Sequence, residues 1–253
     1  MKAKAAIRAG LWMPLLLIAA LSPAGPAAAN GDVTIEGRID LYIGGLKGAE
    51  GDFNGTLAAD GTYSARTELR GAGLVRRVYQ ARVEAEVAGR MEAGDFRPGA
   101  YSLSTRFGSD RQEVNVDFNG DRPEVVVAEP PFRPRPWQIA PEAQVGTIDP
   151  VTAALFLAIP ERAEQVCDRS VEIFDGRRRT RITVRQPRPA FVEGEVICDV
   201  TYTRVSGWSP RRLRDATAFD FVMTLRPIGD GMMQPYKLEG DTSVGRAVAI
   251  LRD

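Results

Sequence analysis

The sequence predicts an all-β protein, a long antiparallel meander that curls into an open barrel or β-spiral and carries one short buried helix. Three observations lead to this fold class. Apolar and polar residues alternate with a period of two through most of residues 33–128 and 167–253. Tight-turn signals rich in glycine separate the alternating segments. A single short stretch that is almost wholly apolar, residues 151–159, lies between the two halves.

The first 29 residues have the three parts of a secretory signal peptide, namely a basic start, an apolar core at residues 11–21 and a run of small residues that ends at Ala29. The apolar core is shorter than the roughly 20 residues that a membrane-spanning helix needs. We therefore expect cleavage near Ala29, a periplasmic location and no transmembrane segment after cleavage. The mature chain, residues 30–253, is expected to form a single curled antiparallel domain.

The first half of this domain, residues 30–128, is expected to contain seven or so strands. Between Val33 and Ile43 the apolar residues are all odd-numbered, and polar residues such as Asp40 stand between them. This pattern predicts a strand with one buried face and one solvated face. The segment from Tyr79 to Val87 alternates in the same way. Tight turns at Asp60-Gly61 and at Asn119-Gly120 link successive strands into a meander.

Residues 129–147 are rich in proline and cannot donate a regular ladder of hydrogen bonds. We expect them to run extended across the surface as a proline-rich strap. Trp137, with Arg133 and Arg135, is a candidate for a partner or ligand site. The alternative is that the strap serves only as a rigid connector.

A helix is predicted over residues 149–159. Asp149 is suited to the N-cap, Pro150 to the first helical turn, and Pro160 stops the helix. Because the intervening residues are almost all apolar, we expect the helix to be buried on both sides against the concave face of the sheet.

The second half of the domain, residues 167–253, contains the only two cysteines, Cys167 and Cys198. In an exported chain they are expected to form one disulfide, the alternatives being two buried free thiols or a redox-active pair. The first and third strands of a flat sheet lie about 9–10 Å apart, but bridged Cα atoms must lie within about 7 Å. We therefore expect Cys167 to precede its strand, in the segment that leaves the helix, and to staple that segment to the sheet.

A basic run surrounds the turn at Asp175-Gly176. The alternation places Arg177, Arg179 and Arg181 on one solvated face. Two interpretations remain open. The arginines either bind an anion, such as a lipid phosphate or an acidic envelope polymer, or they keep an edge strand from pairing with other chains. Two aromatic residues, Trp137 and Trp208, complete the set of candidate binding residues.

The composition excludes several kinds of chemistry. The sequence has no histidine, which removes Ser-His-Asp and Cys-His catalysis and histidine-ligated zinc. Once the three basic residues of the leader are removed, 30 Lys+Arg stand against 33 Asp+Glu, a formal charge of −3 that predicts no affinity for nucleic acid. We expect no catalytic residues, no metal and no cofactor.

The landmarks together resemble a family of bacterial envelope proteins, the domain of unknown function 3108. The motifs that carry the resemblance are spread over nearly all of residues 30–253, and each is short. They are Tyr42 with Gly44-Gly45-Leu46 and Gly48, Tyr63, Gly73-Leu74 with Arg76-Arg77-Val78-Tyr79, Asp149-Pro150 with Thr152-Ala153, Phe174-Asp175-Gly176-Arg177-Arg178, and Cys198 with Tyr202, Val205, Gly207 and Trp208. The resemblance implies an exported, mostly antiparallel β protein with no assigned activity. A looser fold-level likeness is to periplasmic β-spiral proteins that maintain envelope integrity.

Three functions follow as hypotheses. The first is a non-enzymatic periplasmic protein that supports the envelope by binding a partner protein, a lipid or a cell-wall component. The second is a carrier in which the curled sheet holds an acyl chain. The third is a carboxylate-based hydrolase, which needs two acidic side chains about 5–9.5 Å apart in a cleft.

Overall fold

The computed structural model describes residues 31–73, 76, 80–120, 122–186, 191–192, 194–242 and 245–252. The predicted signal peptide, residues 1–29, and the first residue of the predicted strand at Tyr79 lie outside these ranges. No helix in the described part of the chain is long and apolar enough to cross a membrane.

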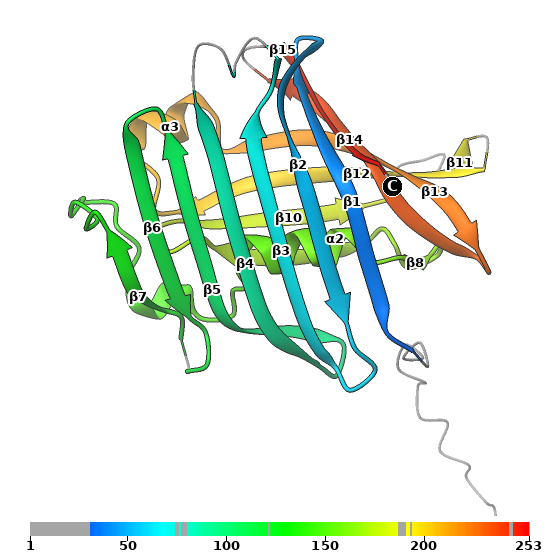
Figure 1. Ribbon diagram of the computed structural model, residues 1–253, viewed down its shortest axis with the longest axis horizontal. Helices are drawn as coiled ribbons and strands as arrows, with labels where there is room; N and C mark the ends of the chain where they lie inside the picture. The colour runs from blue at the N-terminus through cyan, green and yellow to red at the C-terminus, as the bar shows by residue number, and fades with distance from the viewer. Residues whose placement is uncertain are drawn as a thin grey trace, which may run out of the picture.

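The first half of the chain forms seven consecutive antiparallel strands in one curved layer (Figure 1). These are β1 (Val33–Ile43), β2 (Leu46–Leu57), β3 (Thr62–Gly71), β4 (Ala81–Glu92), β5 (Asp95–Phe107), β6 (Asp110–Asp117) and β7 (Glu124–Glu129). β2 begins at Leu46, because the Gly44-Gly45 turn is tight enough for pairing with β1 to start there.

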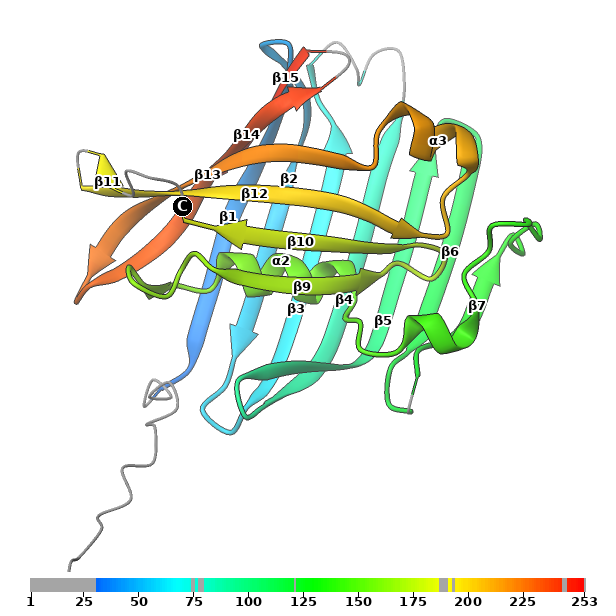
Figure 2. The same cartoon turned by 180° about the vertical axis from the view of Figure 1, so that it is seen from behind.

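The second half continues the same sheet through β1 and crosses over the first layer at a steep angle (Figure 2). Its strands are β8 (Glu161–Arg162), β9 (Arg169–Phe174), β10 (Arg179–Arg185), β11 (Phe191–Val192), β12 (Glu195–Ser206), β13 (Ala218–Gly229), β14 (Met232–Thr242) and β15 (Gly245–Arg252). The six-residue helix α3 (Pro210–Asp215) joins β12 to β13. The sheet runs from β7 through β1 and β15 to β9, and these two ends are not hydrogen-bonded to each other. The predicted antiparallel meander curled into an open barrel is therefore confirmed.

The helix α2 (Pro150–Ala158) lies between the two layers. Both Val151 N and Thr152 N donate to the Asp149 side chain, as the predicted N-cap requires. Leu155 is 0% exposed, and side chains of α2 contribute to all three apolar clusters of the interior. The predicted burial of this helix on both sides is confirmed.

The alternation predicted for β1 is wrong at its second half. Asp40 was expected to be solvated, but it is 5% exposed because Lys47 Nζ lies 2.7 Å from one carboxylate oxygen and Arg252 Nε lies 3.0 Å from the other. The hydrogen bond from Lys47 is the largest cause of a lowered pKa at Asp40. Ile43, which was expected to be buried, is 47% exposed because it is the last residue before the β1–β2 turn.

The disulfide between Cys167 and Cys198 is present, with a Cα–Cα distance of 5.7 Å. Cys167 precedes β9, and Cys198 lies on β12, with β10 between these two strands. Both residues are buried in one apolar cluster. The predicted staple between the chain leaving α2 and the sheet is therefore confirmed.

The proline-rich strap is only partly extended, because it contains the short 3-10 helix η1 (Pro141–Gln144). Beyond η1, Ile148 pairs with the free side of β9. Ile148 N donates to Glu172 O at 2.9 Å, and Phe174 N donates to Ile148 O at 2.8 Å. Ile148, directly after the strap, thus occupies the free side of β9, which is one edge of the open barrel.

Candidate anion-binding cleft

The turn between β9 and β10 is built from the run Phe174-Asp175-Gly176-Arg177. Asp175 Oδ1 accepts hydrogen bonds from Arg177 N at 2.8 Å and Arg178 N at 2.7 Å. Gly176 has a φ of +90°, which favours glycine, and a Cβ there would lie 2.7 Å from Val114 Cγ1 of β6. The turn therefore packs closely against β6, on the side of the barrel where β7 and β9 are not hydrogen-bonded to each other.

The strap passes beside this turn and is held to it through an aromatic side chain. Phe132 packs against the main apolar cluster, and the Arg177 guanidinium lies over its ring at 4.6 Å from the centroid. Further along, the Arg135 guanidinium lies 5.9 Å from the ring centroid of Trp137. Ile139 is buried and anchors the strap before η1. The strap and the turn thus face each other across a narrow space.

A cleft of about 330 Å³ lies between the start of β7, the strap, η1 and the β9–β10 turn. We call it the arginine cleft. Its lining residues include Arg122, Glu124, Val125, Phe132, Arg133, Arg135, Trp137, Gln144, Gly176, Arg177 and Gly207.

The charges of the arginine cleft are strongly unbalanced. Its four arginines are all exposed, and one of them, Arg122, lies 3.6 Å from Glu142 of η1. Within the described residues, no carboxylate lies within 4.0 Å of Arg133, Arg135 or Arg177. Three guanidinium groups are therefore left to attract an anion, although residues 30–253 as a whole carry a formal charge of −3.

The structure separates the predicted arginines into two groups. Arg177 and Trp137 line the cleft, but Arg179 and Arg181 both pair with Glu172 on β9. Arg179 also donates through Nη1 to Ala143 O and, at 3.2 Å, to Val145 O. The predicted solvation holds for Arg177 and Arg181, which are exposed, but not for Arg179, which is half-buried because Glu172 and the strap carbonyls receive its hydrogen bonds. Arg179 fastens the strap to the hairpin.

Trp208 is not part of the cleft surface, so its predicted binding role is wrong. It is 8% exposed and lies between the guanidinium groups of Arg178, at 4.5 Å from the ring centroid, and Arg204, at 4.7 Å. The preceding Gly207 is packed so closely that a Cβ would lie 2.4 Å from Arg177 O. Trp208 therefore supports the back of the β9–β10 turn.

Several cleft residues were not identified from the sequence, among them Arg122 and Gln144. Arg122 lies in the connection between β6 and β7, and Gln144 ends η1, where it is buried. No motif or periodicity marks either position. Only the approach of β7 to the strap brings them into the same cleft.

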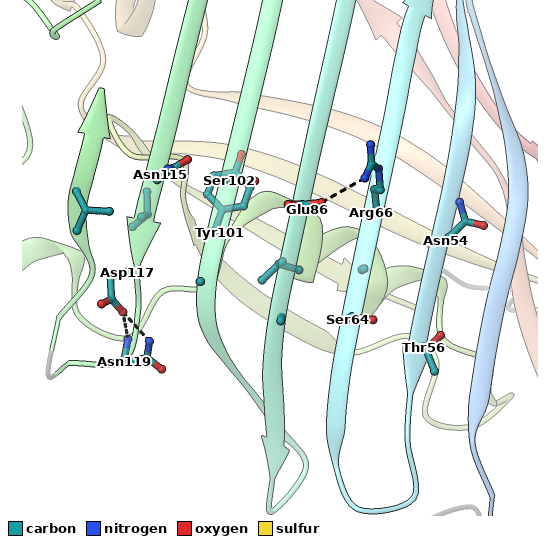
Figure 3. Close-up of a pocket in the computed structure, with 16 residues that line it drawn as sticks. Asn54, Thr56, Ser64, Arg66, Glu86, Tyr101, Ser102, Asn115, Asp117 and Asn119 are labelled. Atoms are coloured by element: carbon teal, nitrogen blue, oxygen red, sulfur yellow. Dashed lines mark hydrogen bonds and ion pairs between the residues drawn. The ribbon is translucent and has the colours of Figure 1, made fainter. Parts of the chain in front are cut away.

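A larger hollow, of about 700 Å³, lies on the outer, polar face of the first layer (Figure 3). Its small side chains include Ser64, Ala88 and Ala100. Its arginine is matched by an acid, since Arg66 Nη1 lies 3.4 Å from Glu86 Oε2. Its lining also contains Asp117, so the hollow has no excess of arginine, unlike the arginine cleft.

A buried polar cluster lies at the start of α2. Besides its two backbone donors, Asp149 accepts from Thr152 Oγ1, which in turn lies 2.9 Å from the Tyr63 hydroxyl. Burial raises the pKa of Asp149 to about 6. Because Asp149 and Thr152 are both 0% exposed, this cluster positions the helix and is closed to a ligand.

Three comparisons with known proteins were made, and the match to a family model agrees with the first resemblance. No curated protein matches the chain. A solved structure with a similar chain path is a beta-barrel-like protein of Domain of Unknown Function DUF1849 from Brucella abortus. It has a TM-score of 0.44 and 11% sequence identity, over 87% of this chain and 95% of that chain. The family described as "Protein of unknown function (DUF3108)" matches residues 38–188, which include the second half of β1, all of β2–β7, the strap, α2 and the β9–β10 turn. This chain belongs to the DUF3108 family.

Proposed function

We propose that this protein is a non-enzymatic envelope protein that binds an anionic ligand in the arginine cleft. The observation that carries the proposal is the convergence of Arg133, Arg135 and Arg177, none with a carboxylate partner among the described residues, at the open side of the barrel.

The geometry of the arginines suits phosphate or carboxylate groups. A guanidinium that lies over an aromatic ring keeps the N–H groups at its edge available, and these can hold an oxyanion through two parallel hydrogen bonds. Arg177 on Phe132 has this arrangement. The cleft volume of about 330 Å³ is near the lower end for ligand pockets, which suits a charged head group better than a whole lipid.

The disulfide supports an oxidising compartment, and with the predicted signal peptide we propose the periplasm. Two sources there supply the required chemistry: the head group of an anionic lipid and an acidic polymer of the envelope. Both present the same oxyanions to the cleft.

The two other functions have less support. The place where an acyl carrier would hold its chain contains α2 and the side chains of three apolar clusters. We also propose that the protein has no catalytic activity, since a carboxylate-based hydrolase would need a pair of acids facing each other. The acids at the arginine cleft are Glu124 in its lining and Glu142, which pairs with Arg122.

Charge reversal tests the proposal. Arg133→Glu and Arg177→Glu should each weaken binding of sodium pyrophosphate, of phosphatidylglycerol vesicles or of poly-glutamate by at least about tenfold, a change of ~1.4 kcal/mol. Calorimetry and vesicle flotation at low salt would measure it, since salt screens exposed charges. The matched control is Arg38→Glu, at an exposed arginine of β1.

The pattern of binding identifies the source of the anion. Binding of vesicles alone indicates a lipid head group, and binding of the soluble polymer alone indicates an acidic polymer. The proposal is overturned if none of the three probes binds, or if Arg38→Glu weakens binding as much as the two cleft variants do.

A further inference from the structure

The two terminal strands of the open sheet, β7 and β9, differ in whether their outer sides are hydrogen-bonded. The outer side of β9 is hydrogen-bonded to Ile148, the residue that follows the strap. The outer side of β7 has no main-chain partner within the described residues, and β7 is the terminal strand of the sheet order. Figures 1 and 2 both show β7 at the margin of its layer.

The free edge of β7 is apolar in its centre. Val126 is 57% exposed and Val127 is 37% exposed. The strand contains no lysine or arginine, although its pairing with β6 is irregular at Val126. Pro123 and Pro130 flank it, so the available edge is six residues long, or about 20 Å.

The β7 edge and the arginine cleft form one continuous surface. Glu124 and Val125, the first two residues of β7, line the cleft. A strand added antiparallel to β7 would therefore have its C-terminal end beside the arginines. Main-chain hydrogen bonds along the edge and a carboxylate in the cleft would then act on the same ligand.

We propose that β7 receives an extended segment of a partner protein by antiparallel strand addition, with acidic residues at the C-terminal end of that segment held in the arginine cleft. This inference rests on the proposed function and identifies its anion as part of a protein. The excess of arginine over carboxylate in the cleft favours an acidic segment.

A second copy of the same chain fits this edge less well than a segment that is acidic at its C-terminal end alone. Full antiparallel pairing of two β7 strands would set Glu124 opposite Glu129 of the other copy, at both ends of the pair, and like charges directly opposite each other destabilise a strand pair. A segment that is acidic at its C-terminal end alone sets one acid opposite Glu124, beside the arginines of the cleft. Pairing with a second copy is therefore an outcome that the test must exclude.

The experiment uses the disulfide-bonded protein and the peptide acetyl-Thr-Val-Thr-Val-Glu-Glu with a free carboxyl terminus, titrated by calorimetry to about 1 mM. Two further peptides carry N-methyl groups on both threonines or on both valines. Because alternate N–H groups of a strand face the same side, strand addition requires one of these peptides to bind at least about tenfold more weakly and the other to bind like the parent. A peptide with glutamines and a C-terminal amide should also bind at least about tenfold more weakly.

Protein variants place the peptide on β7. Val127→Asp should weaken binding of the parent peptide, and Ile228→Asp, at a 48% exposed position of β13, should not. The proposal is overturned by equal binding of the two N-methylated peptides, by absence of parent binding, or by self-association that Val127→Asp abolishes. If the protein still binds pyrophosphate or vesicles in those cases, the proposed anion site is supported and strand addition to β7 is rejected.

Discussion

The Arg177 guanidinium lies over the ring of Phe132, with its Cζ 4.6 Å from the ring centroid. This contact joins the β9–β10 turn to the strap and forms one wall of the arginine cleft. It therefore links the stability of the strap to the binding site.

Replacing Arg177 by glutamine should lower the free energy of unfolding by about 0.5–1 kcal/mol, the range for an exposed cation–π contact. Urea unfolding measures the change. Arg177→Lys keeps the charge but loses the planar group, so it should recover part of the stability and less of the anion binding. Equal anion binding by the lysine variant and the native protein would contradict a planar role for the guanidinium.

Gly176→Ala should destabilise the protein by roughly 1–3 kcal/mol and weaken anion binding. The residue has a φ of +90°, and the new Cβ would meet Val114 Cγ1 at 2.7 Å, so the turn must shift away from β6. Gly94→Ala is a suitable control, since Gly94 has a φ of +89° but open space around its Cβ position. If Gly176→Ala and Gly94→Ala both bind anions as the native protein does, the packing of the turn against β6 does not determine the shape of the cleft.

Removal of the disulfide by Cys167→Ser with Cys198→Ser should lower the free energy of unfolding by about 3–4 kcal/mol, the loop-closure entropy for a separation of 31 residues. The bridge lies in the cluster around Val196 and Leu225, not at the cleft. We therefore expect anion affinity to be retained in the folded fraction. Urea unfolding with and without reductant checks the stability, and calorimetry below the unfolding transition checks the affinity.

Asp149 should make the protein less stable as the pH rises through the window from 3.8 to about 6. Burial raises the pKa of Asp149 in the folded state to about 6, above the ordinary value of 3.8. Between these two values the folded state binds more protons than the unfolded state, so the free energy of unfolding falls as the pH rises. The effect is on the order of 2–3 kcal/mol and is complete above the folded pKa.

The test compares Asp149→Asn with the native protein by urea unfolding at pH 4, 5, 6 and 7. Asparagine also caps a helix but does not titrate. The groups around Asp149 include Tyr63 and Tyr101, whose pKa values are both raised by burial. Other carboxyls, such as Asp40, have lowered pKa values and act in the opposite direction, so the difference between the two proteins is the quantity to measure. An identical pH dependence in both would contradict the role of Asp149.

Local sequence patterns were sufficient to predict features that depend on one residue type in one structural role. The capping of α2 by Asp149 could be predicted from the Asp-Pro pair and the apolar run that follows. The position of Cys167 before its strand followed from the distance that a bridge can span.

The errors occur where a distant segment changes the surroundings of a side chain. Asp40 has the sequence pattern of a solvated residue, but Lys47 and Arg252 cover it. Arg179 has the pattern of an exposed strand residue, but carbonyls of the strap receive its hydrogen bonds. Alternation reports which side of a strand a residue is on and contains no information on what lies above that side.

The antiparallel strands, the buried helix and the disulfide could be predicted from sequence patterns, because period, capping and covalent geometry act over short distances or through a single bond. Other features depend on the tertiary packing: the sheet stays open between β7 and β9, Ile148 pairs with β9, and Arg122, Arg133, Arg135 and Arg177 meet in one cleft. These features depend on how two curved layers and a strap fit together. That fit is set by the packing of many side chains at once, which no single motif encodes.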